Sequence, residues 1–226
     1  MTITINPLVI DISHHNTGTD PRHPEVIDFH PTHAFGIRGV IHKASEGVYS
    51  VDRCYAVRRP AAREAGMLWG AYHFCSGDPV AAQVDAFMKA ADPDERTCMV
   101  LDYEQNFGKH GNMDIHHAVD FMAQLDQKLG RKCRIYSGNW LKESIGRLGA
   151  GDRAFLLQHP LWLCHYTRPG RDPLMVPGYD RYWLWQYTGD GQGNPPHNVP
   201  GIIAGNGGLD INHYPGTADE LKAEWV

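Results

Sequence analysis

Short apolar runs that end in a polar residue or a turn recur along the whole chain, and they predict strands. There are eight such runs, at residues 8–13, 39–47, 67–74, 99–104, 133–137, 161–166, 182–188 and 209–214. Three other segments carry apolar residues at helical spacing, which predicts helices at residues 52–66, 80–91 and 114–129. Strands therefore alternate with helices in the first half of the chain, and strands joined mainly by loops follow.

This alternation predicts the fold class. Strands separated by helices pair in parallel, and a closed set of them forms a barrel with no exposed edge. Because long helices are expected only between the early strands, the outer ring of helices should be incomplete. With 226 residues, 42% of them hydrophobic, the chain can bury one such core. We expect one α/β barrel domain over residues 1–226, with its core at about 8–214 and a short acidic tail.

The run at residues 99–104 carries the most informative chemistry. It ends in Asp102, Tyr103 and Glu104, and alternate strand residues share a face, so the two carboxyl groups should lie within about 7 Å of each other. In a partly dry cleft such a pair does not ionise equally, which leaves one proton donor and one anion. Glycoside hydrolysis needs that division of roles. A pair that only closes a strand at a solvated edge is the alternative.

Polar side chains also fall at the ends of other predicted strands. In a barrel of parallel strands the chemistry lies at the C-terminal strand ends. Six candidates fall there in this assignment: Asp11, Asp102, Glu104, Tyr136, Tyr166 and Asp210. An acid that points into a barrel needs hydrogen-bond or charge partners, because an unpaired buried carboxylate is costly. The convergence of these six residues at one end of the predicted barrel favours a catalytic cleft.

Aromatic side chains are candidate sugar platforms, because a flat ring covers the C–H face of a sugar while Tyr and Trp also offer a polar tip. The candidates are Tyr72, Tyr136, Tyr166 and Trp185. Packing in the core is the alternative for each, and it weighs most for Trp185, whose facing the pattern does not settle. Lys43 is expected to pair with a carboxylate of the barrel.

The charge balance bears on partners and location. The net charge is −5 at pH 7, and Lys and Arg form only short pairs, so no nucleic-acid partner is expected. No segment has the length of a membrane span, and the N-terminus shows no signal-peptide pattern. We expect a monomer that is made in the cytoplasm.

The cysteines and histidines predict no metal or cofactor. The five cysteines are widely spaced, in apolar surroundings and without a C-x-x-C pair, which is typical of buried free thiols. A single bridge between Cys98 and Cys133, which open neighbouring strands, is the alternative. The 14 histidines show no H-x-H or H-E-x-x-H spacing. A metal-dependent barrel hydrolase stays open as a further alternative.

Six motifs, in order along the chain, resemble those of the lysozymes of glycoside hydrolase family 25. They are Asp11-Ile12-Ser13, Lys43-Ala44-Ser45-Glu46-Gly47, Gly70-Ala71-Tyr72-His73-Phe74, Leu101-Asp102-Tyr103-Glu104, Trp185-Gln186-Tyr187 and Asp210-Ile211-Asn212. The resemblance implies a (β/α)5β3 barrel. It also implies an N-acetylmuramidase that cleaves the β-1,4 bond between N-acetylmuramic acid and N-acetylglucosamine in peptidoglycan, with retention of configuration.

The resemblance assigns roles by position. Glu104 would be the general acid and then the base that activates water. Asp102 would be the nucleophile, or would orient the substrate's own N-acetyl oxygen and stabilise an oxazoline. Asp11 and Asp210 would complete an acidic floor that keeps Glu104 protonated and holds the sugar. A barrel that binds carbohydrate without catalysis is the alternative, although all four acids are present.

The resemblance also sets the expected partner and place of action. The partner would be peptidoglycan glycan strands in the cell wall, which the protein would reach outside the cell or in the periplasm after release or export. One departure concerns residues 189–208, an unusually long loop rich in Gly, Pro and Asn that is expected to shape one end of the cleft.

Overall fold

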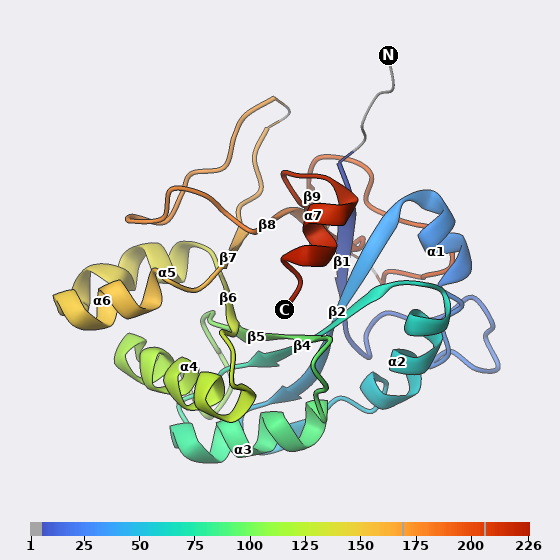
Figure 1. The fold of residues 1–226 in the computed structure, drawn as a ribbon. Coiled ribbons are helices and arrows are strands. Elements are labelled where there is room, and N and C mark those ends of the chain that lie inside the picture. Colours follow the sequence, from blue (N-terminus) through green and yellow to red (C-terminus); the bar gives the residue numbers. More distant parts are fainter. Residues whose placement is uncertain (1–5, 169, 206) are drawn as a thin grey trace.

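The computed structural model describes residues 6–168, 170–205 and 207–226, and within them the strands form one sheet that closes on itself (Figure 1). The barrel strands are β1 (Leu8–Ile12), β2 (Ile37–Glu46), β4 (Leu68–Phe74), β5 (Thr97–Asp102), β6 (Arg134–Ser137), β7 (Leu161–Cys164), β8 (Leu184–Gly189) and β10 (Asp210–His213). Two short arms, β3 (Ser50–Val51) and β9 (Gln192–Gly193), pair with β2 and β8. The predicted α/β barrel is confirmed, and each expected strand is present.

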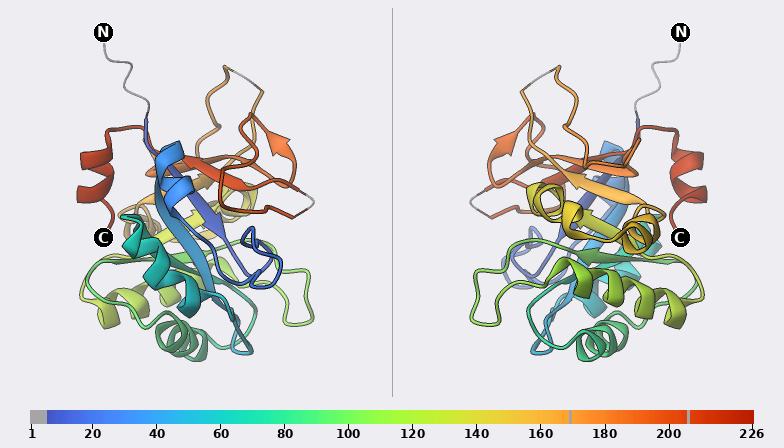
Figure 2. Two further views of the ribbon diagram at one scale, coloured as in Figure 1. Left: turned by 90° about the vertical axis from the view of Figure 1, so that its right-hand side faces the viewer. Right: turned by 90° about the vertical axis from the view of Figure 1, so that its left-hand side faces the viewer.

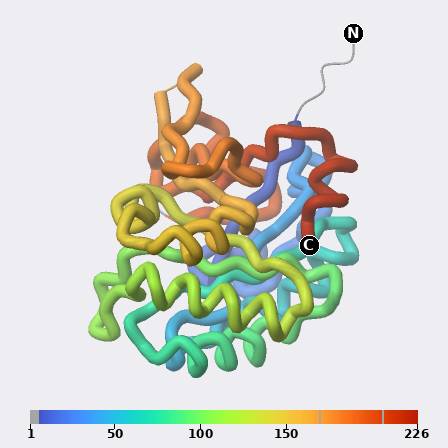
Figure 3. Tube along the Cα trace, turned by 60° about the vertical axis from the view of Figure 1, so that its left-hand side comes forward, coloured from blue at the N-terminus to red at the C-terminus, as the bar shows by residue number. Residues whose placement is uncertain are grey.

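Strand direction changes once around the barrel. Neighbouring strands from β1 to β8 run parallel, whereas β10 is antiparallel to both β1 and β8. Figure 3 shows this seam, where the red C-terminal segment lies beside the blue first strand. The reversal corrects one prediction. Asp210 was expected at the C-terminal end of a strand, but it is the first residue of β10. Its side chain still reaches the expected end of the barrel, since Asp210 pairs with Asp11.

Helices cover part of the outside of the barrel. They are α1 (His30–Phe35), α2 (Tyr55–Glu64), α3 (Val80–Ala91), α4 (Ile115–Leu129), α5 (Asn139–Ser144), α6 (Ala150–Leu156) and α7 (Ala218–Ala223), with a 3-10 turn, η1, at Ile145–Arg147. The three expected helices are α2, α3 and α4. The sequence marks α4 most clearly, because Asp114 caps its first turn and Gly130 ends it with a φ of 67°. The other helices are too short for a periodic signal.

Alternation along the strands separates two apolar layers. Val100 points into the barrel with Val9, Ile41 and Trp162, whereas Leu101 belongs to the layer between the sheet and the helices. Each of these side chains is at most 1% exposed. Burying a large apolar side chain contributes about 1.5–3 kcal/mol, so both layers stabilise the closed barrel.

The last helix, in the segment that was predicted only to be a short acidic tail, closes the base of the barrel. Thr217 and Glu220 form a capping box at the start of α7. After the helix, Trp225 is 2% exposed and its indole nitrogen donates to the Trp69 carbonyl at 2.9 Å. A Cβ at Gly39 would lie 2.7 Å from the Trp225 ring, so a larger residue at position 39 would displace it. Figure 2 shows α7 on the side opposite the loops that follow the strand ends.

The cysteines are free thiols, as predicted. Cys98 points into the barrel, whereas Cys133 lies under the helices, so the alternative bridge between them does not form. Among the helices of the described ranges, none is long and apolar enough to cross a membrane.

Candidate active site

A pocket of about 140 Å³ opens at the end of the barrel where the parallel strands finish. Its lining is mostly acidic and aromatic: Asp11, Tyr72, Asp102, Glu104, Tyr136, Trp162, Tyr166, Gln186, Asp190 and Asp210. The structure therefore brings together seven of the nine site residues predicted from the sequence. Trp162, Gln186 and Asp190 are additional.

The strand geometry brings the acids to one place. Asp102 is the last residue of β5, and Glu104 lies two residues beyond it, outside the strand. The backbone N–H of Tyr103 still donates to the Tyr136 carbonyl at 2.9 Å. This bond continues the pairing with β6 past the end of β5. Asp102 and Glu104 therefore line the same pocket, while Tyr103 is buried beneath the helices.

Two side-chain amides fix the position of Asp11. Gln186 Nε2 lies 3.3 and 3.1 Å from its two carboxyl oxygens, and Asn212 Nδ2 lies 2.8 Å from Oδ2. The oxygen of the Gln186 amide accepts from the Tyr136 hydroxyl at 2.8 Å and the Tyr166 hydroxyl at 3.0 Å. Because both hydroxyls donate to that oxygen, the amide nitrogen must face Asp11. This network holds the floor of the pocket in one arrangement.

The environment separates the acids by their pKa values. Burial raises the pKa of Asp11 to about 6, against the opposing effect of its hydrogen bonds from the two amides. Burial, with the charges of Asp11 and Asp190, raises the pKa of Glu104 to about 7. Burial and Asp11 raise the pKa of Asp210 to about 9. Asp11 is thus the best-supported anion, and Glu104 is poised to exchange a proton near neutral pH.

Asp102 is buried and has a free acceptor. Its Oδ1 atom has no hydrogen-bond partner among the described residues. Burial and nearby Glu104 raise the pKa of Asp102 well above its usual range, and Lys43 opposes them. A buried carboxyl oxygen without a partner is costly, so a substrate N–H or O–H placed here would be held strongly.

Two predicted binding residues lie outside the pocket lining. Lys43 pairs with Glu46 of its own strand at 2.5 Å, and its ammonium lies 5.1 Å from the centre of the Phe74 ring. The Trp185 indole donates to the His165 carbonyl at 2.8 Å. Because strand neighbours point to opposite faces, Trp185 turns outward where Gln186 turns inward.

The sequence pattern could have identified some of the three additional pocket residues but not all of them. Gln186 is the centre of the Trp185-Gln186-Tyr187 motif, and alternation along β8 would have found it once one inward residue was known. Trp162 alternates inward in the same way along β7. Asp190 follows β8 in a loop, where no periodicity indicates direction. Gly189, just before it, leaves room for the site, since a Cβ there would lie 2.1 Å from an Asp210 carboxyl oxygen.

A wider groove of about 520 Å³ continues from the pocket and shares Glu104 and Tyr166 with it. Phe107 and Trp140 also line this groove, and Phe107 is 92% exposed. The pocket is therefore one part of a longer cleft that can accommodate an extended molecule.

The family model for glycosyl hydrolases family 25 matches residues 10–194. The chain belongs to this family. Among its relatives, the uncharacterized protein YegX of Escherichia coli O157:H7 is 31% identical over 187 residues, which cover 80% of this chain and 60% of YegX. Lysozyme M1 of Streptomyces globisporus is 27% identical over 194 residues, covering 80% of this chain and 61% of that protein. The chain thus spans about 60% of the length of these curated relatives.

Solved structures of family 25 proteins share the fold. The bacterial lysozyme from Streptomyces coelicolor superposes with a TM-score of 0.78 and 26% identity, covering 98% of each chain. The muramidase from Acremonium alcalophilum superposes with a TM-score of 0.75 and 25% identity, covering 96% of this chain and 97% of its own. The family 25 barrel therefore extends over nearly the whole sequence.

Proposed function

We propose that this family 25 protein is a peptidoglycan hydrolase that cleaves the β-1,4 bond between N-acetylmuramic acid and N-acetylglucosamine, with retention of configuration. The observation that carries the proposal is the state of Glu104. It lines an acidic pocket next to Asp102, and its pKa is raised to about 7. A carboxyl group that keeps its proton near neutral pH can protonate a glycosidic oxygen.

Glu104 acts first as acid and then as base in this proposal. Its proton passes to the leaving oxygen as the glycosidic bond breaks. The resulting carboxylate then takes a proton from the attacking water, which returns Glu104 to its starting state. The carboxylate of Asp11, held by Gln186 and Asn212, keeps the proton on Glu104 beforehand.

Asp102 takes part in the reaction at the sugar by one of two routes. As nucleophile, it forms a covalent glycosyl ester. In the substrate-assisted route its partner-free oxygen receives the acetamido N–H, and the N-acetyl oxygen attacks to give an oxazoline. A glycosyl-Asp102 adduct detected by mass spectrometry would establish the first route. Tight inhibition by a thiazoline analogue, with no adduct, would establish the second.

The remaining pocket residues bind the sugar. Asp210, with its raised pKa, offers a carboxylic acid O–H to a hydroxyl of the substrate. Tyr72, Tyr136 and Tyr166 supply flat faces and phenolic tips along the wall. The adjoining groove receives the neighbouring part of the polymer.

We infer that the partner is the glycan strand of peptidoglycan and that the protein acts on the cell wall, outside the cell or in the periplasm. One chain supplies the whole pocket, which supports action as a monomer.

The test compares the wild type with Glu104→Gln on purified peptidoglycan. Borohydride reduction of the released fragments, followed by mass spectrometry, identifies the new reducing ends. Reduced muramic acid is expected from the wild type, and a rate loss of at least about 10²-fold is expected in the variant, because a general acid is removed. Glu95→Gln is the matched control, since the Glu95 side chain is 83% exposed and lies outside the pocket.

Three outcomes would contradict parts of the proposal. Reduced glucosamine ends would keep the hydrolase but move the cleaved bond. Full activity in Glu104→Gln would show that Glu104 is not the general acid. No fragments from a folded wild type would favour a carbohydrate-binding barrel without catalysis.

A further inference from the structure

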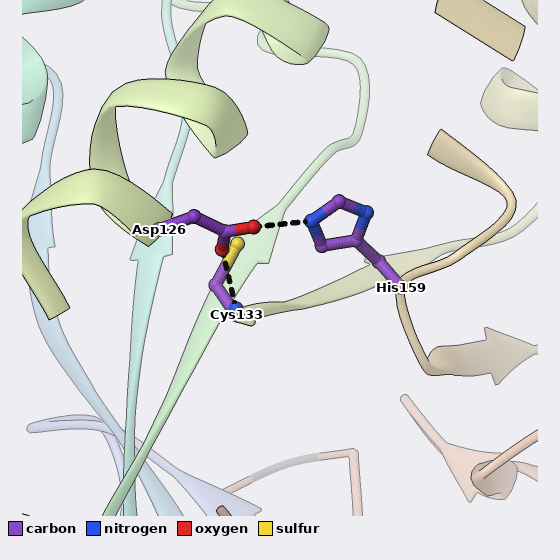
Figure 4. A group of neighbouring side chains, drawn as sticks. All are labelled: Asp126, Cys133 and His159. Carbon is purple, nitrogen blue, oxygen red and sulfur yellow. Dashed lines mark hydrogen bonds and ion pairs between the residues drawn. The ribbon is translucent and has the colours of Figure 1, made fainter. Parts of the chain in front are cut away.

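Three side chains of types that can bind a metal ion come from separate parts of the chain and lie close together (Figure 4). None of them lines the acidic pocket. Asp126 comes from α4, Cys133 lies just before β6, and His159 lies just before β7. One ligand atom from each residue lies within 4.8 Å of the others. The His159 side chain is fully buried and that of Asp126 is 18% exposed. Within the described ranges, this is the one group of three or more such residues close enough to share a metal ion.

Both ring nitrogens of His159 face oxygen atoms. Nδ1 lies 3.0 Å from the Phe155 carbonyl, and Nε2 lies 2.8 Å from Asp126 Oδ2. A neutral imidazole has one N–H and so can donate to only one of these acceptors. The carbonyl oxygen can only accept, so Nδ1 carries a proton. The close contact between Nε2 and the carboxyl oxygen therefore requires a proton or a metal ion between them.

The surroundings prepare the three groups as ligands. A histidine that binds a metal through Nε2 is commonly oriented by an Nδ1–H bond to a backbone carbonyl, as Phe155 provides here. The second oxygen of Asp126 accepts the backbone N–H of Cys133 at 2.7 Å, which fixes the carboxylate. Cys133 Sγ lies 4.0 Å from the Met122 carbonyl. The thiol also hydrogen-bonds with the Asp126 carboxylate, so the sulfur already lies next to a second ligand of the group.

We propose that Asp126, Cys133 and His159 bind a zinc ion at a structural site. Thiolate, imidazole and carboxylate are the donors that zinc takes in proteins, with bonds of about 2.0–2.3 Å. A tetrahedral zinc holds such ligand atoms about 3.3–3.7 Å apart, which small side-chain shifts can reach from the present spacing. A water would be the fourth ligand, because the group of potential ligands found among the described residues has three members.

The position indicates a stabilising role. Cys133 and His159 lie at the starts of β6 and β7, the end of the barrel opposite the acidic pocket, and Asp126 ties α4 to both. Bound zinc would link three elements that are far apart in the sequence. This site is independent of the proposed hydrolase activity.

The test uses the full chain purified without chelator. We expect about one zinc per chain by elemental analysis, and a thiolate-to-cobalt charge-transfer band when Co²⁺ replaces zinc. Cys133→Ser should lose the band. Cys98→Ser, a matched change at a buried thiol inside the barrel, should keep it. Chelation should lower the wild-type Tm by about 5–10 °C and leave the Tm of Cys133→Ser unchanged.

The proposal is overturned if the wild type binds neither metal and the chelator leaves its Tm unchanged. A hydrogen bond between His159 and Asp126 would then explain the geometry. A cobalt band that persists in Cys133→Ser would also overturn it. If that variant does not fold, X-ray absorption of the zinc-loaded wild type decides, since the site requires one sulfur ligand. Chelated protein should still cleave peptidoglycan below its Tm, and loss of that activity would contradict a purely structural role.

Discussion

At the scale of single residues, the protonation of the pocket depends on a few neighbours of Glu104. Gln186 and Asn212 donate to Asp11 and so favour its carboxylate. The charge of Asp11, together with that of Asp190, raises the pKa of Glu104. Asp190 therefore affects the reaction without needing to touch the reacting bond.

Asp190→Asn should move the basic limb of the kcat/KM pH profile to lower pH by about 0.5 unit. Glu104 must hold its proton to act as an acid, and a nearby anion stabilises that proton, so removing the anion releases it at lower pH. Asn tolerates the left-handed φ of 50° found at this position. Asp85→Asn on α3, where the side chain is 71% exposed, is the control. A limb that stays in place or moves upward would contradict this electrostatic role.

At the scale of elements, α7 and the residues after it belong to the core. The C-terminal segment is acidic overall, but Leu221 and Trp225 stand four residues apart and both enter the inner layer of the barrel. They fill the base of the barrel below the residues that line the pocket.

Trp225→Ala should lower the free energy of unfolding by about 3–5 kcal/mol, because it leaves a cavity against Trp69 and Gly39. Urea denaturation measures the loss. The half-exposed neighbour gives the control, since Val226→Ala should change stability by less than about 0.5 kcal/mol. Catalysis by the folded variant should persist, because the site lies at the other end. A loss below about 1 kcal/mol would mean that α7 does not close the core.

At the scale of the whole molecule, the buried acids make stability depend on pH. The pKa of Asp210 rises from 3.8 to about 9 and that of Glu104 from 4.5 to about 7 on folding. Between the unfolded and folded values, the native state keeps protons that the unfolded chain releases. The stability that these groups contribute is complete below about pH 4 and is lost as pH rises through 7 and then 9.

Asp210→Asn replaces the titrating group by a neutral one of the same shape. Its free energy of unfolding relative to the wild type should therefore rise by at least about 1 kcal/mol between pH 4 and pH 8. Urea denaturation at the two pH values provides the measurement. A difference between the proteins that is independent of pH would show that Asp210 ionises normally in the folded state.

The sequence by itself determined the barrel class, the eight barrel strands and the three long helices, because the periodicity of apolar residues reports local burial. It also indicated Asp11, Asp102, Glu104 and Asp210, since acids at the ends of apolar strands have few structural uses. These signals are local, and they do not depend on which segments become neighbours.

Only the tertiary structure decided which parts meet. Closure of the barrel determined that Gln186 faces the pocket and Trp185 does not, because alternation alone leaves the choice of face open. The reversed β10 brought Asp210 beside Asp11. Folding also placed Asp190 at the pocket, and it joined Asp126 to Cys133 and His159 from three elements. Such contacts between distant segments have no period in the sequence, so only the closed barrel creates them.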